Sequence, residues 1–263
     1  MIEKSEILKM YLNGKSAYEI LPLTDYKSVH SIYNIVRKNG HEVRTRAGVK
    51  NLYLKHNYFE NVNTEHKAYW LGFLMADGCI EKRNKSQTSI GIEIKNIDKY
   101  LLEEWKKDIG TNNKIANTRK GCCRIRVHSN KMADDLSKYN IVPNKSHREN
   151  HIIKLKEPFM SPFIRGMFDG DGWIYMRKEY GNLTFGLCGT FTTMADIEEY
   201  LRYELKIPKV KVCNYKNKVP FFTHYSKNSL ERIYKYLYTN STIYLKRKKE
   251  IFDKIYANTE VTN

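Results

Sequence analysis

The sequence contains two related stretches, WLGFLMADG at residues 70–78 and IRGMFDGDG at residues 164–172. In each stretch two small residues stand four positions apart, and an Asp-Gly pair closes an otherwise apolar run. The aspartates, Asp77 and Asp171, are separated by 94 positions. Apolar runs that stop at a glycine are typical of buried helices. We therefore expect two equivalent helices, each ending at an aspartate.

The small residues predict a flat strip along each helix. Gly72 and Ala76 share one helical face, as do Gly166 and Gly170, because residues four apart are neighbours on a helix. Small side chains let another backbone approach closely, so the two strips fit against each other. This packing would place both helix ends side by side and project the two motif aspartates from one edge.

Two carboxylates at adjacent helix C-termini repel each other and the local helix dipoles. A divalent cation would relieve this repulsion, and hard oxygen ligands suit Mg²⁺. Such a cation can acidify a water molecule and orient a phosphodiester. A single Asp-Gly at a helix end is ordinary capping chemistry, so the prediction of a metal site depends on the repetition of the motif.

The residues that follow each motif repeat the same order of elements, which indicates an internal duplication. In the first copy, alternation and helical periodicity predict strands at 88–94 and 122–127 and helices at 98–108 and 131–139. In the second copy they predict strands at 182–189, 210–214 and 219–225 and helices at 192–205 and 229–238. Both copies are therefore of the α+β class.

The N-terminal segment predicts three short helices. An apolar run around Ile7 closes at a glycine, and SAYE at 16–19 forms a capping box that opens a second helix. Pro22 ends that helix, and Thr24 or Asp25 can cap the third, whose apolar face carries positions 29, 32 and 36. A short helix, a tight turn and a longer helix form a helix-turn-helix pattern.

A helix-turn-helix presents the start of its last helix to the major groove of DNA. The residues that this geometry nominates for base or phosphate contact are Tyr26, Lys27, His30 and Ser31. Those expected to grip the DNA backbone are Arg37, Lys38, Arg44 and Arg46. The alternative is a three-helix cap with a purely structural role.

The charge balance points to a polyanionic partner. Lysine and arginine number 46 against 29 acidic residues, a net charge of +17, and nucleic acid is the leading candidate. No apolar run reaches the roughly 18 residues of a membrane span, and the cysteines lack C-x-x-C spacing. We expect reduced thiols, no membrane partner and a cytoplasmic, intracellular protein with access to DNA.

The two motifs resemble the LAGLIDADG motif of homing endonucleases. The resemblance covers about residues 65–255, including the flanks AYW at 68–70 and FIR at 163–165. It implies two pseudo-symmetric αββαββα-type halves, at 66–157 and 158–257, whose curved antiparallel sheets form a saddle for DNA. A helix-turn-helix domain at 1–48 and an asparagine-rich linker at 49–65 would precede them, in a monomer that acts as a pseudo-dimer.

The resemblance also implies an activity, the metal-dependent cutting of both strands of a long double-stranded DNA site with short 3′ overhangs. Asp77 and Asp171 match the carboxylates that would hold Mg²⁺, which Mn²⁺ can replace. Further candidate ligands are the backbone carbonyls of Gly78 and Gly172 or of Ala76 and Gly170. A basic residue late in each half would assist catalysis.

For the first half that basic residue is Lys145, in VPNKS at 142–146. In the second half it lies in YLKRKK at 244–249, where position favours Lys246 while Lys248 stays open; a solvated phosphate-binding face is the alternative for this run. Basic residues near the expected strands are candidate saddle contacts: Lys82, Arg83, Arg119, Arg124, Arg126, Arg177, Lys209, Lys211, Lys216 and Lys218.

Two alternatives share much of this pattern. One is a non-cleaving protein of the same fold, an intron maturase that binds RNA or a DNA-binding regulator. The other is a helix-turn-helix regulator whose large C-terminal part only dimerises or senses a ligand. Neither needs two Asp-Gly helix ends, so both motif aspartates favour the endonuclease.

Overall fold

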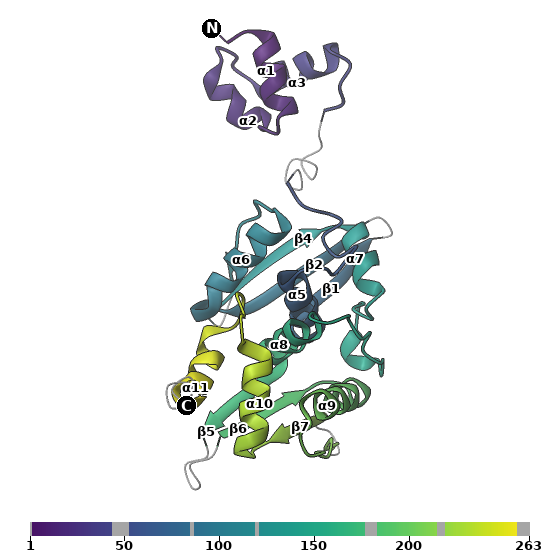
Figure 1. Ribbon diagram of the computed structural model, residues 1–263. Coiled ribbons are helices and arrows are strands. Elements are labelled where there is room, and N and C mark those ends of the chain that lie inside the picture. Colours follow the sequence, from purple (N-terminus) through teal and green to yellow (C-terminus); the bar gives the residue numbers. More distant parts are fainter. Residues whose placement is uncertain are drawn as a thin grey trace. The chain divides into compact units, whose positions relative to one another are not determined.

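The computed structural model of the protein describes residues 2–43, 53–84, 87–118, 121–176, 183–214 and 219–256. Its contacts divide the chain into two compact units (Figure 1). The smaller unit contains residues 1–54 with 110–113, and the larger contains 55–109 with 114–263. Each unit has a hydrophobic core of its own.

The smaller unit is built from short helices around one apolar cluster. The capping box is present as expected, because the Ser16 hydroxyl accepts from the backbone N–H of Glu19 while the Glu19 carboxylate accepts from the backbone N–H of Ser16. The core gathers Ile7, Tyr11, Ala17, Ile20, Ile32, Ile35 and Val36. The elements are α1 (Lys4–Leu12), α2 (Ala17–Ile20), the 3₁₀ turn η1 (Leu21–Leu23) and α3 (Val29–Lys38).

The third helix begins later than the sequence suggested. Ser28 is its N-cap and accepts a hydrogen bond from the backbone N–H of His30 at 3.2 Å. The expected cap at Thr24 or Asp25 was wrong, because the Thr24 hydroxyl instead donates to the carbonyl of Leu21 and closes the preceding turn. Tyr26 and Lys27 therefore lie before α3, while His30 and Ser31 lie in its first turn.

Two helices packed side by side form the centre of the larger unit (Figure 1), α5 (Glu65–Ala76) and α8 (Met160–Asp171). The predicted strips meet: a Cβ added to Gly72 would collide with the Phe163 carbonyl, and one added to Gly166 with the Tyr69 carbonyl. Larger residues at either glycine would force the two backbones apart. The strip prediction is confirmed.

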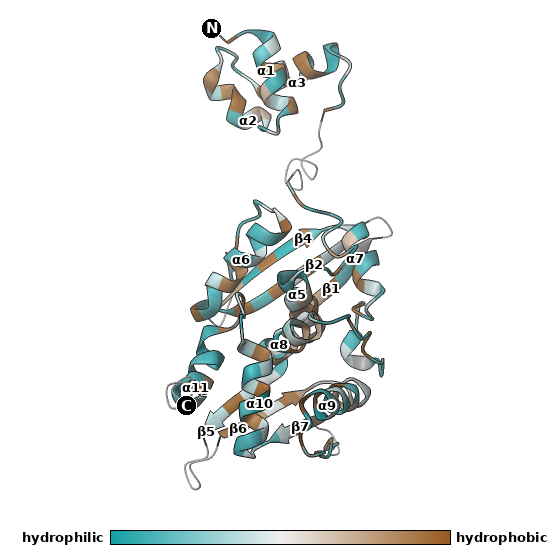
Figure 2. Cartoon of the chain, viewed as in Figure 1, coloured by the Kyte–Doolittle hydropathy of each residue, from teal (hydrophilic) through white to brown (hydrophobic). Residues whose placement is uncertain are grey.

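The first half contains α5 and a four-stranded antiparallel sheet in the order β1-β2-β4-β3. Alternate residues of β2 and β4 are buried and apolar. Both strands carry brown, hydrophobic segments among teal ones in Figure 2. The elements are β1 (Gly78–Asn84), β2 (Gln87–Lys95), η2 (Asn96–Asp98), α6 (Lys99–Ile109), β3 (Ala116–Asn117), β4 (Cys122–His128), α7 (Asn130–Ser137) and η3 (Lys145–His147).

The second half repeats this order with a three-stranded sheet, β5-β6-β7, among the described residues. The segment 210–214, expected as a strand, only touches the sheet through a bridge between Cys213 and Phe221. The backbone N–H of Val210 instead donates to the buried carboxylate of Glu198 at 2.9 Å. The elements are β5 (Gly172–Met176), β6 (Leu183–Cys188), α9 (Phe191–Leu205), β7 (Phe221–His224), α10 (Lys227–Tyr238) and α11 (Lys246–Tyr256).

The last part of the expected linker is packed into the larger unit. Phe59 is fully buried and its ring stacks on Trp105, while Tyr58 meets both rings edge-on. Residues 44–52 lie outside the described part of the chain. The packed region of this unit therefore begins before Glu65. Within the described ranges, none of the helices has both the length and the apolar character needed to cross a bilayer.

Candidate active site

The ends of α5 and α8 deliver the two motif aspartates to one cavity of about 1030 Å³. Asp77 follows the last residue of α5, and Asp171 is the last residue of α8. Lys145 and Cys188 line the same cavity. The expectation that the two carboxylates meet beside one another agrees with this arrangement.

The electrostatics of the pair show why it is unstable by itself. The pKa of Asp171 is raised to about 6, mainly by desolvation and in addition by the negative charge of Asp77. Desolvation also raises the pKa of Asp77, while the charges of Lys248 and Lys145 oppose this increase. A positive charge placed between the carboxylates would lower both pKa values.

Lys145 stands beside the first motif, as predicted from its position. It begins the short turn η3, and its ammonium donates to the carbonyls of Ala76 at 3.0 Å and Gly78 at 2.8 Å. Burial lowers the pKa of this lysine, and the charges of Asp171 and Asp77 act in the opposite direction. The side chain thus ties the end of α5 to the turn η3, late in the first half.

In the second half the corresponding place belongs to Lys248, so the positional preference for Lys246 was wrong. The Lys248 ammonium donates to the carbonyls of Phe168, Asp169 and Gly172, at 2.5, 2.8 and 2.6 Å. Burial lowers its pKa to about 8. Lys246 is exposed, and its ammonium lies over the ring of Tyr100 at 4.7 Å.

The helical periodicity of α11 explains why Lys248, and not Lys246, lies beside the second motif, and this periodicity can be read from the sequence. Lys248, Phe252 and Tyr256 are the buried residues of α11 and recur every four positions, so they form its inward face. Lys246 lies about half a turn away from that face. Four consecutive basic residues suggest a solvated surface, so the inward position of Lys248 was not evident from the charge pattern.

Asp169, which corresponds to Met75 in the first motif, has a structural role. Its carboxylate is 2% exposed and accepts from the Tyr69 hydroxyl at 2.8 Å and the Leu245 backbone N–H at 2.7 Å. Burial raises its pKa to about 6, while the charge of Lys248 lowers it. Asp169 therefore joins α8 to α5 and to the start of α11.

The donor set fits a small divalent cation held mainly by carboxylates. Among the described residues no cluster of three or more His, Cys, Asp or Glu side chains is present, so Asp77 and Asp171 would be the side-chain ligands. Three backbone carbonyls that we considered as ligands, those of Ala76, Gly78 and Gly172, already accept lysine ammonium groups and are poorly suited to a cation. Mg²⁺ commonly binds through one or two carboxylates with waters and substrate phosphates.

The predicted saddle contacts are only partly described. Arg124 and Arg126 lie on one face of β4, as expected, and Lys82 is exposed on β1. The following lie outside the described residues: Arg44, Arg46, Arg119, Arg177, Lys216 and Lys218, together with the side chain of Arg83. Arg126 donates to Glu81 at 3.1 Å and Arg124 to Glu93 at 3.5 Å, so glutamates share this face with the arginines.

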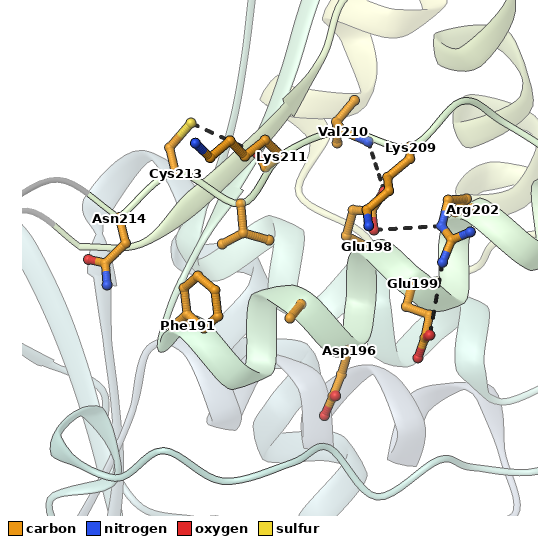
Figure 3. Close-up of a pocket in the computed structure, with 12 residues that line it drawn as sticks. Phe191, Asp196, Glu198, Glu199, Arg202, Lys209, Val210, Lys211, Cys213 and Asn214 are labelled. Atoms are coloured by element: carbon orange, nitrogen blue, oxygen red, sulfur yellow. Dashed lines mark hydrogen bonds and ion pairs between the residues drawn. The ribbon is translucent and has the colours of Figure 1, made fainter.

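A second cavity lies between α9 and the segment 209–214 (Figure 3). Lys209 and Lys211 line it and are exposed. Its polar contacts hold the segment to the helix, since Glu198 accepts from Val210 and pairs with Arg202 at 3.9 Å. The motif aspartates and their lysines do not line this cavity. It is therefore separate from the catalytic candidates.

Comparison with known proteins agrees with the first motif and the residues that follow it. Residues 64–139 match the model of the LAGLIDADG-like domain. The RNA polymerase subunit Rpo1C of Methanocaldococcus jannaschii is 23% identical over 161 residues, which cover 59% of this chain and 17% of that subunit. An uncharacterized protein of the same organism is 27% identical over 163 residues, 59% of this chain and 58% of that protein. The chain thus matches only part of each curated relative.

Solved structures extend the likeness across both halves. The LAGLIDADG homing endonuclease I-LtrWI, bound to target DNA, is 16% identical with a TM-score of 0.51, covering 79% of this chain and 92% of that one. I-GzeII in complex with its DNA target is 16% identical with a TM-score of 0.50, covering 74% and 93%. A mutant of I-SmaMI is 14% identical with a TM-score of 0.54, covering 74% and 92%. The larger unit has the α+β fold of the LAGLIDADG homing endonucleases.

Proposed function

We propose that the chain is a site-specific DNA endonuclease that hydrolyses both strands of a long target and leaves short 3′ overhangs. The observation that carries this proposal is the convergence of Asp77 and Asp171 on one cavity, each beside a lysine bound to the backbone of its motif. The fold and the net charge of +17 support it. Proteins that share the fold without cleaving DNA do not require this paired site.

Asp77 and Asp171 would hold Mg²⁺, for which Mn²⁺ can substitute. When bound there, the cation would lower the pKa of an attacking water and neutralise charge on the scissile phosphate. The chain's own lysines add positive charge at the same edge, and the negative charges of Asp171 and Asp77 favour the charged form of Lys145. Lys248 Nζ adds its charge from a buried position, because its N–H groups donate to three carbonyls of the second motif.

The smaller unit would add a second DNA contact. Its order of short helices is compatible with a helix-turn-helix; the exposed Lys27 precedes α3, and the exposed His30 lies in its first turn. We propose that it extends the recognised site beyond the region bound by the two sheets. The monomeric chain would then contact three successive segments of DNA, one for each half and one for this unit.

The decisive experiment is cleavage of a pooled library of candidate DNA sites by the full chain, by Asp77→Asn and by Asp171→Asn. The natural chain should make a discrete double-strand break with Mg²⁺ and none with EDTA. Each substitution should reduce the cleavage rate by about 10³-fold or more while DNA binding is retained, because carboxylate ligands are removed and the surface is kept. Asp134→Asn, an exposed aspartate on α7, is the matched control and should cleave normally.

Binding without cleavage by all four proteins would contradict the endonuclease and favour the maturase or the regulator. A separate footprinting experiment tests the smaller unit in the full chain. Lys27→Ala combined with His30→Ala should shorten the footprint at one end and leave Mg²⁺-dependent cutting measurable at high protein concentration. An unchanged footprint and affinity would remove the smaller unit from the DNA-binding surface.

A further inference from the structure

The central strand of each sheet carries a glycine at the same place relative to its motif. In the first half Gly91 of β2 pairs with Cys79, two residues after Asp77. In the second half Gly186 of β6 pairs with Trp173, two residues after Asp171. Both glycines lie on the sheet face opposite the helix-facing core. The buried Ile90 and Phe185 directly precede them, and successive strand residues face opposite sides.

In the first half an arginine crosses this glycine. Arg126 of β4 pairs with Gly91, and a Cβ added to Gly91 would lie 3.0 Å from Arg126 Cγ and 3.5 Å from Nε. The guanidinium continues to β1 and donates to Glu81 at 3.1 Å. Its side chain therefore lies flat over three strands, and 26% of its surface remains exposed.

In the second half an indole occupies the same place. A Cβ added to Gly186 would collide with the Trp173 ring, so the ring lies flat on the glycine. Phe221 meets the indole edge-on at a centroid distance of 5.8 Å. Thr223 of β7, which pairs with Gly186, stands where the first half has Arg126. The two sheets thus present different chemistry at equivalent positions.

These two surfaces suit different bases. An arginine presents paired donors that match O6 and N7 of guanine, whereas an aromatic face offers apolar contact to the methyl group of thymine. Arg126 has five N–H donors, so it can keep its bond to Glu81 and still contact a base edge. The bond to Glu81 also restricts the guanidinium to one orientation, which favours discrimination between bases over simple attraction to phosphate.

Building on the proposed function, we propose that Arg126, held flat over Gly91 by Glu81, selects guanine in one half-site, while Trp173 over Gly186 selects thymine at the equivalent position of the other. Both positions adjoin the motif aspartates in the sheet register. The two bases would therefore be among those nearest the cut in each half-site. The target would therefore carry guanine in one half-site and thymine at the equivalent position of the other, whereas a palindromic site would carry the same base at both positions.

The test is selection of bound sequences from randomised DNA by the full chain and its variants, read as base frequencies at each position. The natural chain should give one position dominated by guanine and an equivalent one dominated by thymine. Arg126→Ala should reduce the guanine preference by about 5-fold to 150-fold and leave other positions unchanged. Trp173→Ala should reduce the thymine preference alone, and Lys106→Ala on α6 should change neither.

Gly91→Val is the most specific variant, because it displaces Arg126 while leaving the arginine in the chain. It should reproduce the loss of guanine preference. Arg126→Lys covers the case in which Gly91→Val fails to fold, since lysine keeps the charge but lacks the paired donors. Equal weakening on every sequence by Arg126→Ala would overturn the proposal and make Arg126 a phosphate contact. Failure of the natural chain to select any DNA would instead overturn the proposed function.

Discussion

The two halves of the larger unit share one frame but differ in what surrounds it. Both have a glycine strip, a terminal aspartate and a lysine that donates to backbone carbonyls of the motif. On the two sheets the equivalent positions diverge: Cys79 corresponds to Trp173, Arg126 to Thr223 and Val127 to His224. Within the helix pair Met75 corresponds to Asp169. Symmetry is thus retained at the glycine strips and the motif aspartates, and it is largely lost on the sheets.

The difference between the two lysines shows how the second half is more tightly built. Lys248 is 4% exposed and adjoins the buried carboxylate of Asp169, whereas Lys145 has the apolar Met75 at the corresponding position and lies in a short turn. Lys248 therefore neutralises a buried charge as well as satisfying carbonyls. Lys145 has only the second of these tasks within its own motif. A lysine thus holds backbone carbonyls of the motif in both halves, and in the second half it also neutralises a buried carboxylate.

The largest effect is expected at the glycine strip. Gly72→Val and Gly166→Val should each lower the free energy of unfolding by about 3 kcal/mol or more, because a side chain would meet backbone that cannot rotate away. The two losses should be similar, since Gly72 faces the Phe163 carbonyl and Gly166 faces its counterpart at Tyr69. Denaturant unfolding of the full chain measures both.

Ala195→Val is the control for the glycine substitutions, because it adds a branched side chain to α9 where the residue lines an open cavity. Its stability should stay within about 1 kcal/mol of the natural chain. A large loss at one glycine with almost none at the other would show that the two strips are not equivalent. The twofold relation between the helices would then be only approximate at the point of closest approach.

A smaller and unequal effect is expected for the lysines. Lys248→Met should lower the free energy of unfolding by about 3 kcal/mol, because it leaves the carboxylate of Asp169 buried without its cation. Lys145→Met should cost about 1 kcal/mol, the typical value for lost hydrogen bonds to carbonyls that can rehydrate. Lys246→Met, at an exposed position, is the control and should change stability little. Equal losses for Lys145 and Lys248 would contradict the asymmetry.

Much of this frame could be predicted from the sequence because it depends on short-range patterns. The Asp-Gly helix ends, the small-residue strips and the alternating strands of the first half all follow from spacing along the chain. The extended segment 210–214 also alternates, yet the Glu198 carboxylate takes its backbone N–H, and that competition depends on a contact 12 positions away. No sequence pattern singled out Trp173. Its ring lies over Gly186 only because β5 pairs with β6 in this register, which spacing along the chain does not reveal.

The last prediction concerns Val127 and His224, which occupy equivalent helix-facing positions. His224 is 3% exposed, and burial lowers its pKa to about 4 from the usual 6.5. Between these values the unfolded chain binds more protons than the folded chain, so stability falls as the pH drops from 6.5 to 4. The loss amounts to roughly 3 kcal/mol, from 1.36 kcal/mol for each pH unit between the two pKa values.

His224→Val places the residue of the first half at this position and should remove that part of the pH dependence. The variant should be more stable than the natural chain near pH 4 and nearly equal to it at pH 8, as denaturant unfolding at both pH values would measure. Thr223→Val, on the opposite face of the same strand, should leave the pH dependence unchanged. If His224→Val keeps the full acid sensitivity, the histidine is not the group that distinguishes the second half at low pH, and the carboxylates of Asp169 and Asp171 become the groups to substitute next.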